Sequence, residues 1–517
     1  MKKILSLVAV VSIVVGISNT AYARDSYNVN RLYGADRYKT SISISNSFNS
    51  GTVQNVIVAS GKNFPDALAG SVLSQKYDAP ILLLNSTLNE STDSIDYIKT
   101  HLDKTGHIYV LGGDASVSNE FVNEMRKEGY NNIVRLGGKN RFDTNKFIVD
   151  SMNLEKGTPV VIANGYGFAD ALSVSSVASI KGYPILMTGA SNLPDETKNM
   201  FSTIQPSQVY IIGGTGSVSD NVVNEVKNLV PTLASDKVIR IAGQTRYDTS
   251  LEICKYFNLD TDNAVLANGE NFPDALSGSA LASKLSAPII LTNGQDLINQ
   301  QAFMDTKNYK NLILLGGLGS IDLPIEYSLK GASQISTAEK NYINSLSDYC
   351  SDYITESTDS YNYMTKLLND INVNNELANL TDPNQISDAF GKFSQAFKDG
   401  NAYLETYKQN LIKLKNDAYN LQSPAGLESL KSDYINNIDT EIKSLDTLKG
   451  YIDTYAGIFD SIKNAFKALD MNTVQQKFIE LEDFNNKYMT DLKKLPSGED
   501  NIKNLNDRLT KIKNSMQ

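Results

Sequence analysis

The stretch Asn63-Phe64-Pro65-Asp66-Ala67-Leu68 returns as Gly167-Phe168-Ala169-Asp170-Ala171-Leu172 and again as Asn271-Phe272-Pro273-Asp274-Ala275-Leu276. The aspartates of successive copies are 104 residues apart in both intervals. A unit of about 100 residues has the size of a small domain. The repeats therefore predict three tandem domains rather than the short units of a solenoid.

A second block precedes each copy. It reads Arg31-Leu32-Tyr33-Gly34-Ala35-Asp36-Arg37-Tyr38, then Arg135-Leu136-Gly137-Gly138-Lys139-Asn140-Arg141-Phe142, then Arg240-Ile241-Ala242-Gly243-Gln244-Thr245-Arg246-Tyr247. Short apolar runs follow, such as Val56 to Ala59 and Ile81 to Leu84, and they are typical of strands buried on both faces of a parallel sheet. Helix-like stretches such as Asp66 to Gln75 alternate with them. The predicted fold class is three tandem α/β modules with parallel sheets.

The amino-acid composition changes after about Ala332, where glycine and proline become scarce. Apolar residues then recur at intervals of three or four, which indicates helix. One stripe of this kind comprises Leu427, Leu430, Tyr434, Ile438, Ile442, Leu445, Leu448, Ile452, Tyr455 and Phe459. A second stripe comprises Phe478, Leu481, Tyr488, Leu492 and Leu495. We expect an all-α bundle of four to six antiparallel helices.

The chain begins with an export signal. Lys2 and Lys3 precede an apolar run from Ile4 to Ile17, and Ala21-Tyr22-Ala23 follows, so residues 1–23 read as a signal peptide cleaved after Ala23. The run is shorter than the ~20 apolar residues that a membrane span needs. We expect a secreted protein with no membrane span after cleavage.

Composition excludes several classes of function. The 517 residues carry a net charge of −10, which argues against nucleic acid as a partner. The only cysteines are Cys254 and Cys350, and the only histidines are His101 and His107. They allow no disulfide framework and leave few zinc ligands. We expect unpaired cysteines, no metal and no cofactor.

Arginine usage gives the sharpest chemical signal. The chain has nine arginines, and six of them occupy two positions of the repeated block: Arg31, Arg135 and Arg240 at the first, and Arg37, Arg141 and Arg246 at the second. Arginine differs from lysine in its planar fork, which binds a carboxylate or phosphate through two hydrogen bonds. Two interpretations stay open: anion binding at the surface, or internal pairs such as Arg37 with Asp66 and Arg141 with Asp170. We expect the first position to be structural and the second to bind.

Asp66, Asp170 and Asp274 follow a strand and a loop, where a carboxylate suits the first turn of a helix. A structural, helix-starting role is therefore expected for them, and no catalytic or metal-binding one. Gly-Gly turns are followed by Ser116-Val117-Ser118, Ser217-Val218-Ser219 and Ser320-Ile321-Asp322. Serine and aspartate are good N-caps, so helices are expected to begin there.

These motifs resemble the cell wall binding repeat 2 family, which occurs in threes in exported proteins of clostridia and bacilli. The matching signatures are R-L-x-G-x-x-R-Y-x-T-S, N-G-x-N-F-P-D-A-L, A-P-I-L-L and L-G-G-x-x-S-V-S, and they run from about Arg31 to Ser320. The resemblance implies three modules in a pseudo-threefold arrangement, with grooves where modules meet. It also implies non-covalent attachment to an anionic cell-wall polymer, either teichoic-acid-like or a secondary polysaccharide, at the cell surface.

On this resemblance the chain divides into a signal peptide (1–23), repeats 1 to 3 (24–130, 131–235 and 236–332) and a helical domain (333–517). The polymer-binding positions carried over are the six repeated arginines together with Thr40, Thr144 and Thr249. The second copy departs most from the pattern, with Phe142 for Tyr, Gly167 for Asn, Ala169 for Pro and Val174 for Gly. Its groove is therefore expected to bind weakly or to serve packing only.

Two other functions remain open. One is a wall hydrolase that uses carboxylates of the tail, such as Glu480 with Glu482 or Asp439 with Glu441. The other is a tail that assembles with other surface proteins, as in a surface layer or an adhesin. Some family members carry a zinc amidase domain, but such a site needs at least two His ligands and a carboxylate, and residues 333–517 contain no His. We expect a non-enzymatic protein that binds the wall and displays its tail.

Overall fold

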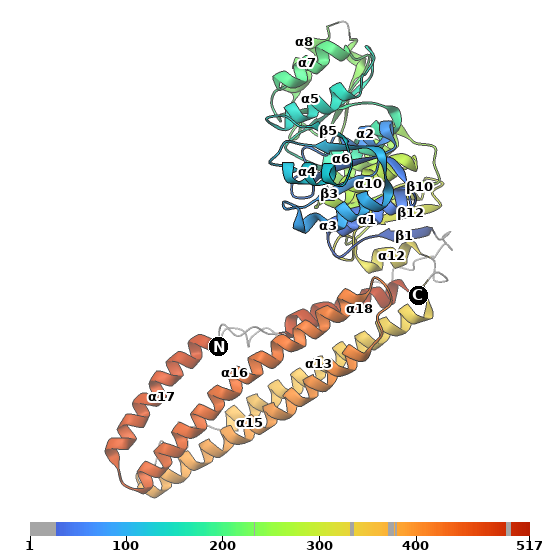
Figure 1. Ribbon diagram of the computed structural model, residues 1–517. Helices are drawn as coiled ribbons and strands as arrows, with labels where there is room; N and C mark the ends of the chain where they lie inside the picture. The colour runs from blue at the N-terminus through green and yellow to red at the C-terminus, as the bar shows by residue number, and fades with distance from the viewer. Residues whose placement is uncertain are drawn as a thin grey trace.

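Three parallel sheets and a long helical tail make up the chain in the computed structural model (Figure 1). The structure describes residues 27–231, 233–330, 335–370, 377, 380–492 and 498–516. The predicted signal peptide (1–23) lies outside the described residues. The two predicted fold classes, α/β followed by all-α, are confirmed.

Each sheet has four parallel strands and the same topology. The first has the order β3 (Ile81–Leu84), β2 (Val53–Ser60), β4 (Leu102–Leu111), β5 (Asn132–Leu136). The second has the order β7 (Ile185–Thr188), β6 (Val160–Asn164), β8 (Val209–Ile212), β9 (Val238–Ile241). The third has the order β11 (Ile289–Thr292), β10 (Asn263–Asn268), β12 (Asn311–Leu315), β1 (Asn28–Leu32). The central strands are almost wholly buried, as their continuous apolar sequences predict.

The leading strand of each repeat belongs to the sheet of another repeat. Strand β5 opens the second repeat but pairs with β4, with Val110 opposite Arg135. Likewise β9 pairs with β8, and β1 pairs with β12, where Leu314 lies opposite Arg31. The first strand thereby completes the last sheet. The three modules form a closed, interlocked ring, and cuts at 130/131 and 235/236 would each remove an edge strand from its sheet.

Helices cover both faces of the sheets. Those that follow the two repeated blocks are α1 (Arg37–Phe48), α5 (Arg141–Ser151), α9 (Arg246–Phe257), α2 (Gly70–Tyr77), α6 (Ala169–Lys181) and α10 (Pro273–Lys284). The outer helices are α3 (Thr92–His101), α4 (Asn119–Lys127), α7 (Asp195–Ile204), α8 (Asp220–Leu229), α11 (Ile298–Met304) and α12 (Leu323–Leu329), with 3₁₀ turns at Asn89–Ser91 and Ser235–Lys237.

A pseudo-threefold axis runs through the contact of α2, α6 and α10, each of which packs against the other two. Glycine also lets α10 lie close to the sheet beneath it, because a Cβ at Gly278 would lie 2.1 Å from Leu315 of β12. Phe64, Phe168 and Phe272, one from each repeat, meet with ring centroids 5.6–6.0 Å apart. The central core therefore combines residues of all three repeats.

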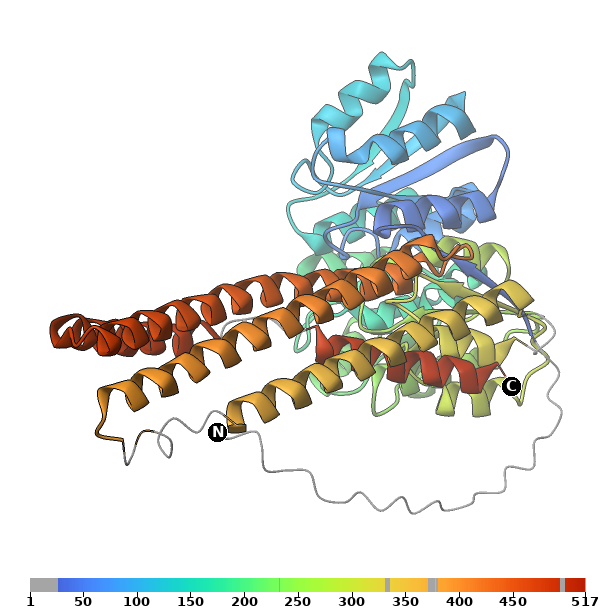
Figure 2. The same ribbon diagram turned by 90° about the horizontal axis from the view of Figure 1, so that it is seen from below.

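The tail projects from the modules as a rod of long helices (Figures 1 and 2). The helices are α13 (Thr337–Asp370), α15 (Pro383–Asn420), α16 (Glu428–Lys467), α17 (Met471–Leu492) and α18 (Glu499–Ser515). Most of the first predicted stripe is buried along α16, which confirms one long helix. Of the second stripe, Leu495 and the side chain of Leu492 lie outside the described residues.

The tail and the third repeat share a hydrophobic core. Leu323 and Tyr327 of α12 are buried in the same cluster as Leu346 of α13 and Leu505 of α18. The Arg508 Nε of α18 also donates to Asp322 Oδ1 at 2.8 Å. The rod is thus held against the modules by side-chain packing, and not by the connecting chain alone.

Candidate functional site

The side chains of Arg31, Arg135 and Arg240 hold the Gly-Gly turns in place. Each arginine lies on the edge strand of the sheet whose turn it holds. Each Nη1 donates to two backbone carbonyls, at 2.8–3.1 Å: Arg31 to Gly316 and Gly317, Arg135 to Gly112 and Val117, and Arg240 to Gly213 and Val218. In each case the planar guanidinium donates to uncharged backbone oxygens inside the protein. Polymer contact by these three arginines stays a prediction.

The partner of Arg31 differs from those of the other two. Arg135 Nη2 donates to Asn119 and Arg240 Nη2 to Asp220, each at the start of a helix. Arg31 Nε donates instead to Glu326 at 2.6 Å, and both side chains are less than a tenth exposed. Burial alone would raise the pKa of Glu326, but Arg31 and Lys330 outweigh it and hold that pKa below its usual value.

Arg37, Arg141 and Arg246 begin the helices that follow the turns. Asp36, Asn140 and Thr245 are the N-caps of these helices, and their side chains accept hydrogen bonds from backbone N–H groups of the first turn. The guanidinium groups donate to the carbonyls of Gly61, Gly165 and Gly269 at 2.6–2.8 Å. Arg37 also lies 5.6 Å from the ring of Phe272, and Arg246 lies 5.7 Å from Phe168, so each reaches the central aromatic cluster of another repeat.

The repeated aspartates accept hydrogen bonds from serines rather than pairing with an arginine of their own repeat. Ser116, Ser217 and Ser320 donate through Oγ to Asp66, Asp170 and Asp274 at 2.5, 2.6 and 2.7 Å. No ion pair joins Arg37 to Asp66 or Arg141 to Asp170 within the described chain, so the internal pairing considered from the sequence is wrong in its partners. Instead, the positive charge of Arg37 lowers the pKa of Asp274, and the positive charge of Arg246 lowers the pKa of Asp170.

Desolvation dominates the electrostatics of two of the three repeated aspartates. It raises the pKa of Asp170 and of Asp274, while the serine hydrogen bond and the arginine of the neighbouring repeat oppose the rise. The turn glycines beside them, Gly112, Gly213 and Gly316, have φ near +100°. A Cβ there would lie 2.2–2.5 Å from an aspartate oxygen, so only glycine fits.

The other predicted positions have structural partners as well. The buried hydroxyls of Thr40, Thr144 and Thr249 accept hydrogen bonds from the N–H groups of Gly34, Gly138 and Gly243 at 3.0–3.1 Å. Helices begin after Ser118, Ser219 and Asp322 as predicted, with these residues as N-caps. Asp170 and Asp274 also lie in the first turns of their helices, whereas α2 begins only at Gly70, so the helix start expected at Asp66 is wrong. The first serine of each motif holds the aspartate instead, a pairing that the sequence analysis missed although both residues recur in every copy.

Grooves open where modules meet. One lies between the second and third repeats, has a volume of about 560 Å³ and is lined by Tyr166, Asp170, Ser217, Arg246 and Thr249 among others. Another lies between the third and first repeats, has a volume of about 360 Å³ and is lined by Arg37, Thr40, Asn271, Asp274 and Ser320 among others. The larger of these two grooves includes residues of the second copy, which has Gly167 and Ala169 where the third has Asn271 and Pro273. Weak binding by the groove of the second copy stays a prediction.

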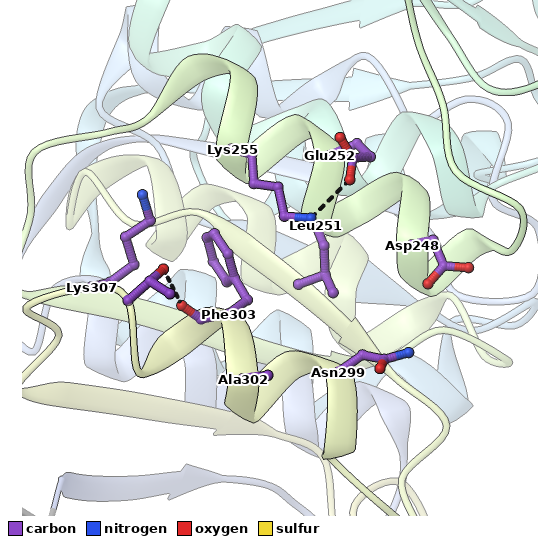
Figure 3. Close-up of a pocket in the computed structure, with 9 residues that line it drawn as sticks. Asp248, Leu251, Glu252, Lys255, Asn299, Ala302, Phe303 and Lys307 are labelled. Atoms are coloured by element: carbon purple, nitrogen blue, oxygen red, sulfur yellow. Dashed lines mark hydrogen bonds and ion pairs between the residues drawn. The ribbon is translucent and has the colours of Figure 1, made fainter.

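A third hollow, of about 630 Å³, lies within the third repeat between α9 and α11 (Figure 3). Its charged groups already have partners. Lys255 pairs with Glu252 at 2.8 Å, Asp248 completes the capping box of α9, and Lys307 donates to Asn258. None of the repeated arginines lines it.

Three of the four carboxylates named for a tail hydrolase have separate partners. Asp439 pairs with Lys415 at 2.6 Å, while Glu441 accepts from the Gly498 N–H at 3.1 Å. Glu480 pairs with Lys477 at 2.6 Å. Among the described residues no group of three or more His, Cys, Asp or Glu side chains is placed to hold a metal ion. Cys254 and Cys350 are both buried and unpaired, as expected.

Comparison with known families shows the class of protein to which the three interlocked modules belong. Residues 31–122, 135–223 and 240–326 each match cell wall binding domain 2 (CWB2). These ranges cover more than half of the chain, which therefore belongs to this family. Such repeats imply a location in the cell wall or at the cell surface. None of the described helices combines the length and apolar character needed to cross a membrane.

Similar proteins share the repeats but extend further. The chain is 31% identical over 315 residues to the N-acetylmuramoyl-L-alanine amidase LytC of Bacillus subtilis, covering 60% of this chain and 59% of that one. It is 33% identical over 302 residues to the amidase enhancer of the same organism, covering 58% and 40%. Among solved structures, Cwp6 from Clostridium difficile matches with a TM-score of 0.51 and 28% identity, covering 57% of this chain and 46% of that one. Cwp8 from the same organism matches with a TM-score of 0.50 and 26% identity, covering 56% and 49%.

Proposed function

We propose that the chain is exported, attaches non-covalently to an anionic wall polymer through its three repeats, and holds its helical tail on the outer surface. The observation that carries the proposal is the pair of junction grooves, each with an arginine of one repeat beside the partly buried aspartate of another. Guanidinium groups in grooves suit a polymer that carries phosphate or carboxylate groups.

The shared core at α12 supports the display role. Because Leu323 and Tyr327 pack into the tail, the rod keeps a constant direction relative to the grooves. A polymer held in the grooves would orient the rod with the modules. We propose no catalytic activity; Asp439 and Glu480 pair with lysines, and Glu441 accepts from a backbone N–H group.

Co-sedimentation of the full chain with purified walls tests attachment. The chain should pellet with walls that retain their anionic polymer and stay in solution with walls stripped of it. Because contacts between exposed charges are screened over ~8–10 Å at physiological ionic strength, molar salt should release the protein while it remains folded. Retention on stripped walls, or in molar salt, would contradict the proposal.

The same incubation tests catalysis. Soluble sugar and amino-group products should not exceed those of a buffer control over several hours. Time-dependent release that scales with protein concentration would establish a hydrolase instead.

A further inference from the structure

One exposed position differs in charge among the three copies. It lies four residues before each repeated aspartate and is occupied by Lys62, Tyr166 and Glu270. Each of these residues directly follows the glycine whose carbonyl accepts from the groove arginine of its own repeat. The position therefore lies beside Arg37 in the first repeat, Arg141 in the second and Arg246 in the third.

In the third repeat this neighbour is an acid that engages the arginine. Arg246 Nη1 lies 3.5 Å from Glu270 Oε2, and the other carboxylate oxygen of Glu270 accepts from the hydroxyl of Tyr247. An incoming anion would have to displace this carboxylate or approach beside it. Arg246 thus has a carboxylate partner within its own repeat, although both side chains remain exposed to solvent.

In the second repeat the neighbour is aromatic. The guanidinium of Arg141 lies 4.5 Å from the ring centroid of Tyr166, and Phe142 packs against the same ring at 5.7 Å. Tyr166 is 63% exposed. The arginine is covered on one face by a cation–π contact, and the ring presents an apolar platform to the solvent.

In the first repeat the neighbour is a cation. Arg37 is exposed, and among the described residues no carboxylate oxygen lies within 4 Å of its guanidinium nitrogens. The nearby Asp36 is occupied in capping α1, accepting from the N–H groups of Tyr38 and Lys39 at 2.9 and 2.8 Å. Lys62 adds a second positive charge, where Glu270 stands in the third repeat.

We propose that this position sets which groove holds the charged groups of the polymer, so that the Arg37 groove, between the third and first repeats, is the principal anion site. The inference rests on the proposed function and adds to it a division of labour. Arg37 and Arg246 each line a groove with a partly buried aspartate of another repeat, so that feature does not distinguish them. The neighbouring Lys62 and Glu270 do.

Two charge changes test the proposal in the full chain, with purified polymer-bearing walls as the probe. Lys62→Glu should weaken binding about three- to tenfold, because it places a carboxylate beside Arg37 as in the third repeat. Glu270→Gln should strengthen binding about two- to fivefold, because it releases Arg246 for the polymer. Both effects should shrink in molar salt.

Matched controls make the same charge changes away from the grooves. Lys181→Glu lies at the far end of α6, about 20 Å from its groove end. Glu155→Gln lies beyond the end of α5, and both residues are exposed. Melting temperatures of all four variants should match the parent chain, because each changed side chain is on the surface.

The outcomes separate the two levels of the argument. If the parent chain binds walls and both groove variants equal their controls, the division of labour is overturned while wall attachment stands. If Glu270→Gln weakens binding as much as Lys62→Glu does, Glu270 contacts the polymer and the proposal is likewise overturned. If the parent chain does not bind polymer-bearing walls, the proposed function fails and this inference fails with it.

Discussion

At the scale of single residues, the two repeated arginine positions differ in what surrounds them. Arg31, Arg135 and Arg240 each donate to two turn carbonyls, whereas Arg37, Arg141 and Arg246 each donate to one carbonyl. Arg37 and Arg246 also line the grooves between modules. A guanidinium can hold two carbonyls and a carboxylate together because its donors are fixed in one plane. An ammonium on a flexible stem cannot reproduce that geometry.

Arg31→Lys should therefore destabilise the protein by about 1–3 kcal/mol. The lysine keeps the charge opposite the buried Glu326 but loses contact with the turn. Chemical denaturation should show the loss, and wall binding by the folded fraction should persist. Arg126→Lys, at an exposed site of α4, is the control and should change neither. Loss of binding at unchanged stability would assign Arg31 to the polymer site.

The raised pKa of the partly buried Asp274 predicts a pH dependence. Because burial raises the pKa of Asp274 above its ordinary 3.8, the folded chain binds this proton at a higher pH than the unfolded chain. Ionisation of Asp274 thus costs stability above the raised pKa, and the cost disappears as the pH falls toward about 4. Asp274→Asn, which still accepts from Ser320, should raise the melting temperature near neutral pH and lose this advantage near pH 4.

The exposed Asp260 provides the control for that measurement. Asp260→Asn should leave the difference between the two pH values as in the parent chain. A melting temperature of Asp274→Asn that falls further below the parent as the pH rises would mean that attraction to Arg37 outweighs burial.

At the scale of elements, α16 shows how a single stripe organises the tail. Ile438 is fully buried between helices, whereas Ile442, one turn later, is only half-buried. Burial rather than residue type decides what each contributes to stability, because truncation of a buried side chain leaves a cavity.

Ile438→Ala should cost about 2–4 kcal/mol, and Ile442→Ala distinctly less. Denaturant unfolding followed by circular dichroism compares the two variants. Equal losses would show that the partly exposed side of α16 is covered by another surface, such as a second chain, and light scattering would then reveal that association.

At the scale of the whole molecule, the third repeat has adapted its last helix to receive the tail. After the N-cap, the first and second repeats continue with Asn119 and Asp220, which bind an arginine, while the third continues with the apolar Leu323. Leu323 instead joins the tail core, and Asp322 binds Arg508. Leucine in place of a polar residue at this position thus contributes to the link between the modules and the rod.

Leu323→Asn restores the residue type of the first repeat and should loosen this link. The parent chain should melt in a single calorimetric transition, because modules and tail share a core. The variant should melt in two, with an increased maximum dimension in small-angle scattering. Leu229→Asn, at an exposed end of α8, should retain the single transition. A variant of Leu323 that still melts as one unit would show that Arg508 and the α18 contacts suffice.

The sequence by itself determined the three copies, the alternation of strands and helices, the long helix of the tail and the residues that recur at the grooves. Each of these is written in local patterns: a spacing of 104 residues, apolar runs, caps and a stripe of three- and four-residue steps. Only the tertiary structure decided that β1 completes the third sheet, that each groove pairs an arginine with an aspartate of another repeat, and that Glu270 engages Arg246 while Lys62 leaves Arg37 exposed. The reason is physical: such contacts join residues as far apart as Arg31 and Glu326, 295 positions along the chain, and no local pattern records which distant side chain folding brings within hydrogen-bonding distance.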